Sequence, residues 1–185
     1  MDLPIFELIL NDEGETGVTA VALVNQPAIG IEYQAFSKQM KFEIADESQR
    51  VVMGAAMIPN LPIYRMDAKN GEYMAIFRKE TIRKIAEQFF KEKRQSSLNE
   101  EHDSERMIDG GYMFQSFITD KNMGIHPPKG FENIADGSWF IAAKIENDEV
   151  WNKIKTDGEY KGFSIEGMFD VIPYQKMSKI IKKYI

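Results

Sequence analysis

The fold class is decided at residues 79–92, which read KETIRKIAEQFFKE. Apolar side chains recur there at the spacing of one helix face: Ile82, Ile85, Ala86, Phe89 and Phe90. This is the clearest helix in the chain. Short apolar or alternating runs, typical of strands, lie on both sides of it. Strands clustered before and after one main helix predict an α+β fold, or a β-barrel with helices packed outside.

The predicted strands are short and bounded by turn residues. They cover residues 3–10, 17–24, 51–58, 72–78, 111–119, 138–145 and 161–172, with a further short strand around Phe42 and Ile44. A second, shorter helix is expected at 147–157, with Asn147 as its N-cap and Gly158 at its end. Residues 91–106 form a polar run, and the Pro/Gly-rich residues 121–137 predict a long loop.

Length and composition limit the function classes. A chain of 185 residues with 43% apolar residues predicts a single globular domain, residues 1–185. The net charge of −6 argues against a nucleic-acid partner, and no apolar run approaches the roughly 20 residues that cross a bilayer. The absence of cysteine excludes thiolate chemistry. The start, MDLPIFELIL, lacks a basic region typical of secretion signals, which indicates a cytosolic site of synthesis. Residues 174–185 predict a basic amphipathic tail that closes the domain or contacts a partner.

The stretch KGFSIEG, residues 161–167, contains the candidate nucleophile Ser164. Its spacing, G-x-S-x-x-G, differs from the G-x-S-x-G elbow of α/β-hydrolases, and the strand-like MFDVIP follows it. On a strand, Ser164 and Glu166 share one face while Phe163 and Ile165 point to the other. The serine then faces a cleft or, as on any half-buried edge strand, solvent.

A serine nucleophile needs a base, and this chain has two histidines. His126 lies in a Pro/Gly loop, whereas His102 lies in NEEHD just before a predicted strand, so His102 is the better candidate. Two alternatives remain open. His102 is an ordinary surface histidine, or it forms a metal site with the neighbouring carboxylates of Glu100, Glu101 and Asp103, although consecutive residues rarely converge on one ion.

Several blocks, in order, resemble phage serine proteases of the XkdF type. They are the opening VTAVALVNQPAIG, then IYR, ETIRKIAEQFFKEKRQSSLNEEHD, and GSWFIAAKIENDEVWNKIKTDGEYKGFSIEG. This family is similar to the prohead maturation proteases of tailed phages. The resemblance implies a herpesvirus protease-like fold, a mostly antiparallel β-barrel ringed by two or three helices.

The resemblance also implies a site. Histidine precedes serine in these proteases, which maps the base to His102 and the nucleophile to Ser164. The third member is implied to be a carboxylate: Glu166 is the first candidate, with Asp170, Glu101 and Asp103 as alternatives. No metal or organic cofactor is implied.

The implied activity is that of a serine endopeptidase that cleaves phage scaffold and capsid proteins, and itself, inside the prohead in the host cytoplasm. The herpesvirus relatives work as dimers, so a homodimer is a candidate state. Two rival functions are a non-catalytic capsid-assembly module of the same fold and a metal-dependent hydrolase centred on His102.

Overall fold

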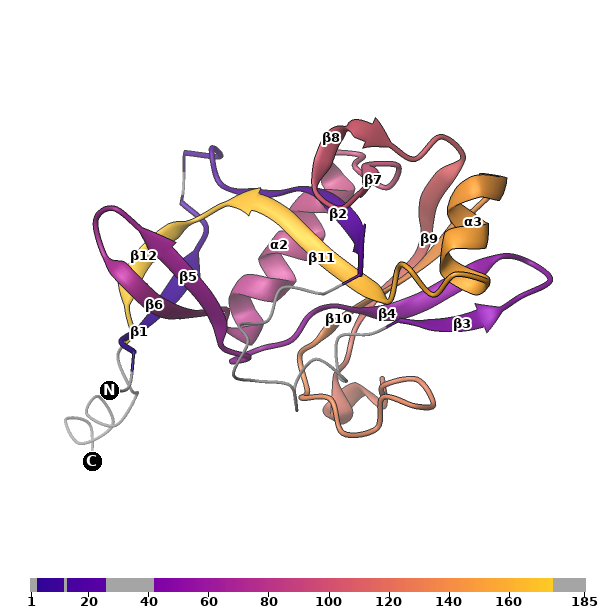
Figure 1. The fold of residues 1–185 in the computed structure, drawn as a ribbon. Coiled ribbons are helices and arrows are strands. Elements are labelled where there is room, and N and C mark those ends of the chain that lie inside the picture. Colours follow the sequence, from indigo (N-terminus) through magenta and orange to yellow (C-terminus); the bar gives the residue numbers. More distant parts are fainter. Residues whose placement is uncertain (1–2, 12, 26–41, 175–185) are drawn as a thin grey trace.

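The computed structural model describes residues 3–11, 13–25 and 42–174 (Figure 1). In this part of the chain, strands outnumber helices and form three four-stranded sheets. The first has the order β12-β1-β6-β5, with β12 (Asp170–Pro173), β1 (Ile5–Ile9), β6 (Gly71–Ile76) and β5 (Ile63–Asp67). The second has the order β3-β4-β10-β9, with β3 (Glu43–Asp46), β4 (Val51–Met57), β10 (Trp139–Ile145) and β9 (Gly111–Ile118).

The third sheet, called here the serine sheet, has the order β11-β2-β7-β8. It consists of β11 (Gly162–Met168), β2 (Gly17–Val24), β7 (Leu98–Glu100) and β8 (Asp103–Met107). β11 pairs antiparallel with β2, β2 pairs parallel with β7, and β7 forms a hairpin with β8. The yellow strand β11 runs on into β12 and so links the serine sheet to the first sheet (Figure 1).

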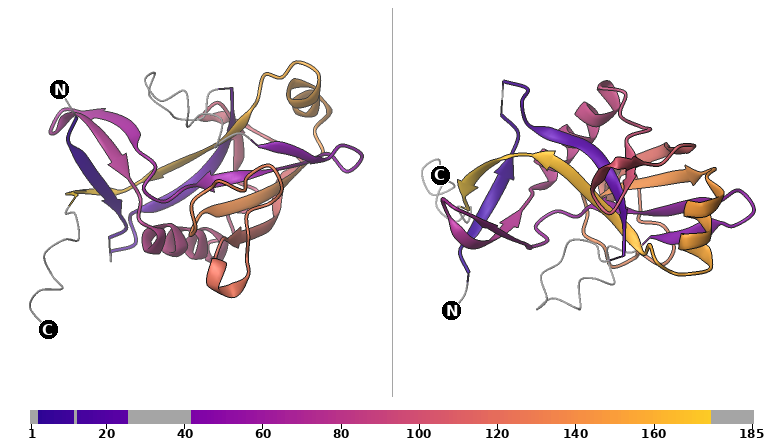
Figure 2. Two further views of the ribbon diagram at one scale, coloured as in Figure 1. Left: turned by 90° about the horizontal axis from the view of Figure 1, so that it is seen from below. Right: turned by 45° about the horizontal axis from the view of Figure 1, so that its top comes forward.

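Helix α2 (Lys79–Lys91) covers one side of the serine sheet and reaches β10 (Figure 2). Its apolar stripe is fully buried at Ile82, Ile85 and Phe89, and the Phe89 ring meets that of Trp139 edge-on at 5.5 Å. Burial of such a stripe, rather than helix propensity, supplies most of the stability of a helix of this length. The predicted helix at 79–92 is confirmed.

Helix α3 (Asp148–Lys155) also follows its sequence signals. The side chain of Asn147 accepts a hydrogen bond from the backbone N–H of Val150 at 3.0 Å, which is the predicted N-cap. Val150, Trp151 and Ile154 form the buried face. A short 3₁₀ turn, η1 (Lys121–Met123), opens the predicted loop. None of the helices in the described residues has the length and apolar character needed to cross a membrane.

The structure is α+β, as predicted, but the sheets do not close into a barrel. Each sheet keeps two edges. In the serine sheet one edge is β8, whose five residues, DSERM, are all exposed and offer no apolar face to bury against another sheet. The barrel expectation is therefore wrong, and the herpesvirus protease-like fold stays a prediction.

Three further expectations need correction. The polar run at 91–106 contains two strands, β7 and β8. All three residues of β7 are buried although two of them are polar, so the polar composition of this run did not indicate a strand. β5 was not expected after the Pro59–Pro62 turn. The predicted strand at 161–172 is two strands, one in each of two sheets. Beyond Tyr174, the predicted basic tail lies outside the described residues.

Candidate active site

Strand β11 holds Ser164 between two residues that face the core. Phe163 is fully buried, and its ring lies 5.3 Å from that of Phe42, while Ile165 packs against the same core. Ser164 points to the other face of the strand. It is only 4% exposed, and its hydroxyl makes no hydrogen bond with any described residue. This serine is therefore not the solvent-facing residue that the alternative interpretation expected.

Gly167 shapes the strand next to Glu166. A Cβ at this position would lie 2.1 Å from the backbone oxygen of Gly17 on β2, so no side chain fits there. The β11–β2 register shifts at the same point, between Glu166 and Gly167, and the hydroxyl of Thr19 donates to the backbone oxygen of Glu166 at 3.4 Å. A β-bulge of this kind re-aims the side chains beside it.

His102 lies in the turn of the β7–β8 hairpin. Glu100 pairs with Asp103, so the turn contains two residues, Glu101 and His102. Both have positive φ, 53° and 63°, as a type I′ turn requires. Asn and Gly are the usual residues at such positions, so both Glu101 and His102 are held in a backbone conformation that is unfavourable for them.

The turn is tied to the end of β2. The carboxylate of Glu101 accepts from the backbone N–H of Asn25 at 2.7 Å, and the backbone N–H of Glu101 donates to Leu23 at 3.0 Å. These bonds fix where the strained turn lies relative to the serine sheet.

The turn brings His102 to Glu166. Nδ1 of the imidazole lies 3.3 Å from Oε1 of the carboxylate, and the two side chains are 39% and 25% exposed. A strand spacing of two residues places Glu166 roughly 6–7 Å from Ser164 along β11. No hydrogen bond joins His102 to Ser164 among the described residues.

The other candidate carboxylates point elsewhere. Glu101 is bonded to Asn25, and Asp103 accepts from the backbone N–H of Glu105 at 2.9 Å. Asp170 pairs with Ile9 in the first sheet, on the far side of the strand junction. His126 is exposed beyond η1 and has no hydrogen bond or ion pair with any described residue.

Sequence reasoning missed Asn99, the residue at the centre of β7. Its Nδ2 donates to Oε1 of Glu166 at 2.5 Å. The side chain is 1% exposed, and its Oδ1 is buried with no partner in the part of the chain that the structure describes. No sequence signal identified it: alternation from the core residue Leu98 places Asn99 on the serine's face only once β7 is known to lie in the serine sheet.

Glu100 lies on the opposite face of β7. Its Oε2 accepts from Nζ of Lys153 at 2.9 Å and from the hydroxyl of Tyr160 at 2.5 Å, and Arg106 lies 3.1 Å away. Burial opposes ionisation of this carboxyl, but these bonds and positive charges outweigh it and lower its pKa. Burial and the carboxylate beside it raise the pKa of Tyr160 to about 12.

The metal-site alternative finds no support in the described residues. No three acidic or histidine side chains converge there closely enough to hold an ion. Glu100 is occupied by Lys153 and Tyr160 on one face of the sheet, while Glu101 bonds the end of β2.

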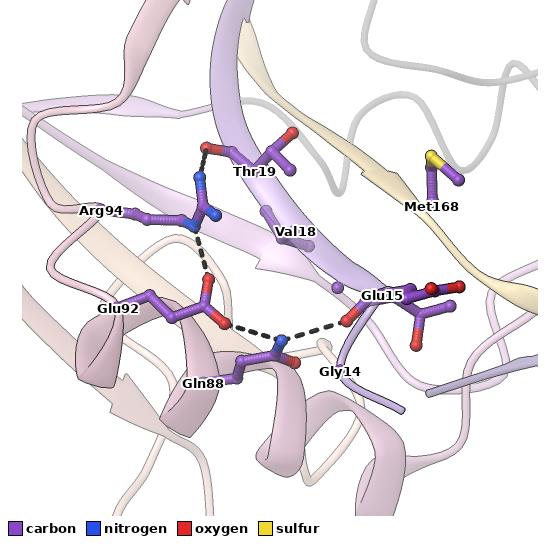
Figure 3. A pocket seen from close by; sticks show the side chains of 10 residues that line it. Gly14, Glu15, Val18, Thr19, Gln88, Glu92, Arg94 and Met168 are labelled. Carbon is purple, nitrogen blue, oxygen red and sulfur yellow. Dashed lines mark hydrogen bonds and ion pairs between the residues drawn. The ribbon is translucent and has the colours of Figure 1, made fainter. Parts of the chain in front are cut away.

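A pocket of about 340 Å³ opens near the start of β2 (Figure 3). Its polar side chains already bond to one another: Gln88 donates to Glu92 at 2.9 Å, and Arg94 forms an ion pair with Glu92 at 2.6 Å. Met168, at the end of β11, completes the wall. The lining does not include the serine or the histidine.

The family described as "Putative phage serine protease XkdF" matches residues 39–173. That range contains Ser164, His102 and every carboxylate considered above, whereas the resembling block at 18–30 precedes it. No curated protein and no solved structure matches the chain. Because the match covers well over half of the residues, the chain belongs to this family of phage serine proteases.

Proposed function

We propose that this protein is a serine endopeptidase in which Ser164 is the nucleophile, His102 the base and Glu166 the carboxylate that orients the base. The observation that carries the proposal is the pairing of His102 with Glu166 at 3.3 Å, on the face of β11 that also bears the shielded Ser164. The family of the chain supports peptidase chemistry.

The mechanism follows from this arrangement. Nδ1 of His102 lies 3.3 Å from Oε1 of Glu166. With its proton on Nδ1, the imidazole presents the lone pair of Nε2 to accept the Ser164 proton. The serine oxygen attacks the peptide carbonyl, and His102 then returns the proton to the leaving amine. Water then gives a proton to His102 and attacks the acyl-enzyme, and His102 returns the proton to the Ser164 oxygen as the carboxylic acid product leaves. The carboxylate stabilises the imidazolium that forms in both steps.

His102 and Ser164 close to hydrogen-bond distance when substrate binds. Catalytic hydrogen bonds are often long or unformed in a free enzyme and tighten in the complex. His102 is 39% exposed and lies in a two-residue turn, so rotation of its side chain is not blocked by tight packing.

The proposed substrates are the scaffold and major capsid proteins of the phage, and the protease itself, inside the prohead. The warrant for these substrates is the family's similarity to prohead maturation proteases. The experiment is co-expression with these proteins, with new chain ends identified by mass spectrometry. Cleavage is expected with the parent chain and with Ser104→Ala, a control that alters an exposed serine two residues from His102. Ser164→Ala is expected to abolish it, and cleavage retained in this variant would refute the proposal.

The second candidate is a non-catalytic module for capsid assembly. One observation favours it: among the described residues the serine hydroxyl and the imidazole are not bonded to each other. Under this alternative, Ser164→Ala assembles normal heads and no new chain ends appear with either variant or with the parent.

A further inference from the structure

We propose that Asn99 is a positioning residue that holds the carboxylate of Glu166 in place beside the imidazole of His102. The inference deepens the proposed function and rests on it. Asn99 lies in a stretch whose polar residues gave no sign of burial, yet it is among the least exposed polar side chains of the described residues, at 1%.

The register of the serine sheet places Asn99 beside the site. Ser164 pairs with Ala22 on β2, and Ala22 pairs with Asn99 on β7, so the three side chains form one row across the sheet. Only a methyl group separates the serine from the amide in this row. Glu166 lies two residues further along β11, opposite Ala20, and reaches back to Asn99 at 2.5 Å.

One carboxylate oxygen therefore faces two partners. Oε1 of Glu166 accepts from Nδ2 of Asn99 and lies 3.3 Å from Nδ1 of His102. The asparagine is held by its strand and by complete burial, whereas the glutamate is 25% exposed and has a long, rotatable side chain. The fixed partner therefore decides where the carboxylate lies.

The chemistry of asparagine suits this role better than that of a lysine or arginine. Its amide donates a hydrogen bond without adding a positive charge, so the carboxylate keeps the negative charge that favours an imidazolium beside it. Its Oδ1 has no partner among the described residues, and a buried unpaired acceptor costs free energy. A leucine would fill a similar volume without that cost, so stability alone does not account for an amide at this position.

The consequence is a defined tautomer. With Oε1 fixed opposite Nδ1, the neutral imidazole carries its proton on Nδ1 and leaves Nε2 free for the serine. Without Asn99, the carboxylate swings into solvent and the ring exchanges between its two tautomers.

The test is the ¹⁵N NMR spectrum of the neutral His102 ring, recorded in the His126→Gln background so that one histidine remains. The parent is expected to show the Nδ1–H tautomer. Asn99→Leu, and Asn99→Asp as a variant of nearly equal shape, are expected to show a mixture of tautomers. Asn147→Ala removes the N-cap of α3, and Asn147 makes no hydrogen bond with Asn99, Glu166 or His102. It is the control for a general loss of stability and is expected to keep the parent spectrum.

Peptidase kinetics supply the second readout. Asn99→Leu is expected to lower kcat by 10- to 100-fold with little change in KM, the size of effect seen when a supporting partner of a functional side chain is removed. An unchanged tautomer in folded Asn99→Leu and Asn99→Asp overturns the assignment, even where the parent is an active peptidase. A parent with the Nδ1–H tautomer, variants with a mixture and no peptidase activity in any of them would instead refute the proposed function and leave the positioning role supported.

Discussion

Two carboxylates on opposite faces of the serine sheet, those of Glu100 and Glu166, have different partners. Glu100, 12% exposed, is surrounded by positive charge from Lys153 and Arg106, with Tyr160 as a further donor. Among the described residues, the side chain of Glu166, 25% exposed, contacts the neutral amide of Asn99 and the imidazole of His102.

We interpret Glu100 as a carboxylate that anchors the hairpin, and Glu166 as the carboxylate that acts in the proposed reaction. The negative charge of Glu100 is compensated by Lys153 and Arg106. Its ion pair with Lys153 joins the β7–β8 hairpin to α3. No lysine or arginine pairs with Glu166 in the described residues, so under the proposed function its carboxylate is the group that stabilises the His102 imidazolium. The turn that holds His102 follows Glu100 directly in the chain and brings the imidazole to 3.3 Å from Glu166.

The largest effect is expected from Glu166→Gln. The glutamine keeps the shape but loses the charge that favours the imidazolium, and its amide can present a donor to Nδ1. Loss of the equivalent carboxylate in serine proteases lowers kcat by about 10⁴-fold, and a fall of about 10³- to 10⁴-fold is expected here. The measurement is kcat on a cleaved peptide. Glu105→Gln, on the exposed strand β8, is the matched control.

A fall of less than 10-fold in Glu166→Gln would remove this carboxylate from the mechanism. The free energy of unfolding is expected to change by less than about 1 kcal/mol, because exposed or half-exposed pairs contribute little to stability.

Glu100→Gln is expected to show the reverse pattern. Removing this charge leaves Lys153, itself 18% exposed, without its main partner. The free energy of unfolding is expected to fall by about 2–3 kcal/mol, since loss of one member of a largely buried pair leaves an uncompensated charge. Urea unfolding measures it. Equal stability in Glu100→Gln and the parent would show that the hairpin is anchored elsewhere.

The smallest of the expected effects is on the pH dependence of the free energy of unfolding. The pKa of Glu100 is lowered from its ordinary value of 4.5, so its contribution to stability is present above about pH 4.5 and is lost as the pH falls through the lowered folded pKa. The pKa of Tyr160 is raised from 10.0 to about 12, so its contribution is complete below pH 10 and is lost as the pH rises toward 12.

Unfolding measured across these two ranges checks the signs. Glu100→Gln is expected to flatten the acid side of the stability curve, and Tyr160→Phe the alkaline side. Glu166→Gln serves as the comparison variant in both ranges. An acid side that is as steep in Glu100→Gln as in the parent would contradict the assignment.

The sequence predicted those parts of the fold that local patterns control. Helix α2 follows from an apolar stripe at helical spacing, and α3 from the cap at Asn147. Strand β2 spans residues 17–24 as expected, because an unbroken apolar run is typical of a strand buried on both faces. The barrel was wrong because closure depends on which strands meet at the edges, and local patterns do not contain that information.

The polar β7–β8 hairpin shows the same limit of sequence-based prediction at the candidate active site. β7 is buried although it reads LNE, because Asn99 and Glu100 find partners that lie far away in the sequence. A parallel pairing between β2 and β7 puts Asn99 in line with Ser164, and no periodicity reveals such a neighbour. Ser164 and His102 could be selected as candidates because the chain contains only two histidines and because its motifs resemble one family.

The most direct test of the central claim is covalent labelling with a fluorophosphonate, which reacts with activated serines, followed by mass spectrometry of the peptides. The account predicts an adduct on Ser164 in the parent and in Ser104→Ala, a strongly slowed reaction in His102→Ala, and no adduct at this position in Ser164→Ala. An absence of adduct on Ser164 in the parent, or labelling at the same rate in His102→Ala, would contradict a nucleophilic serine activated by this histidine.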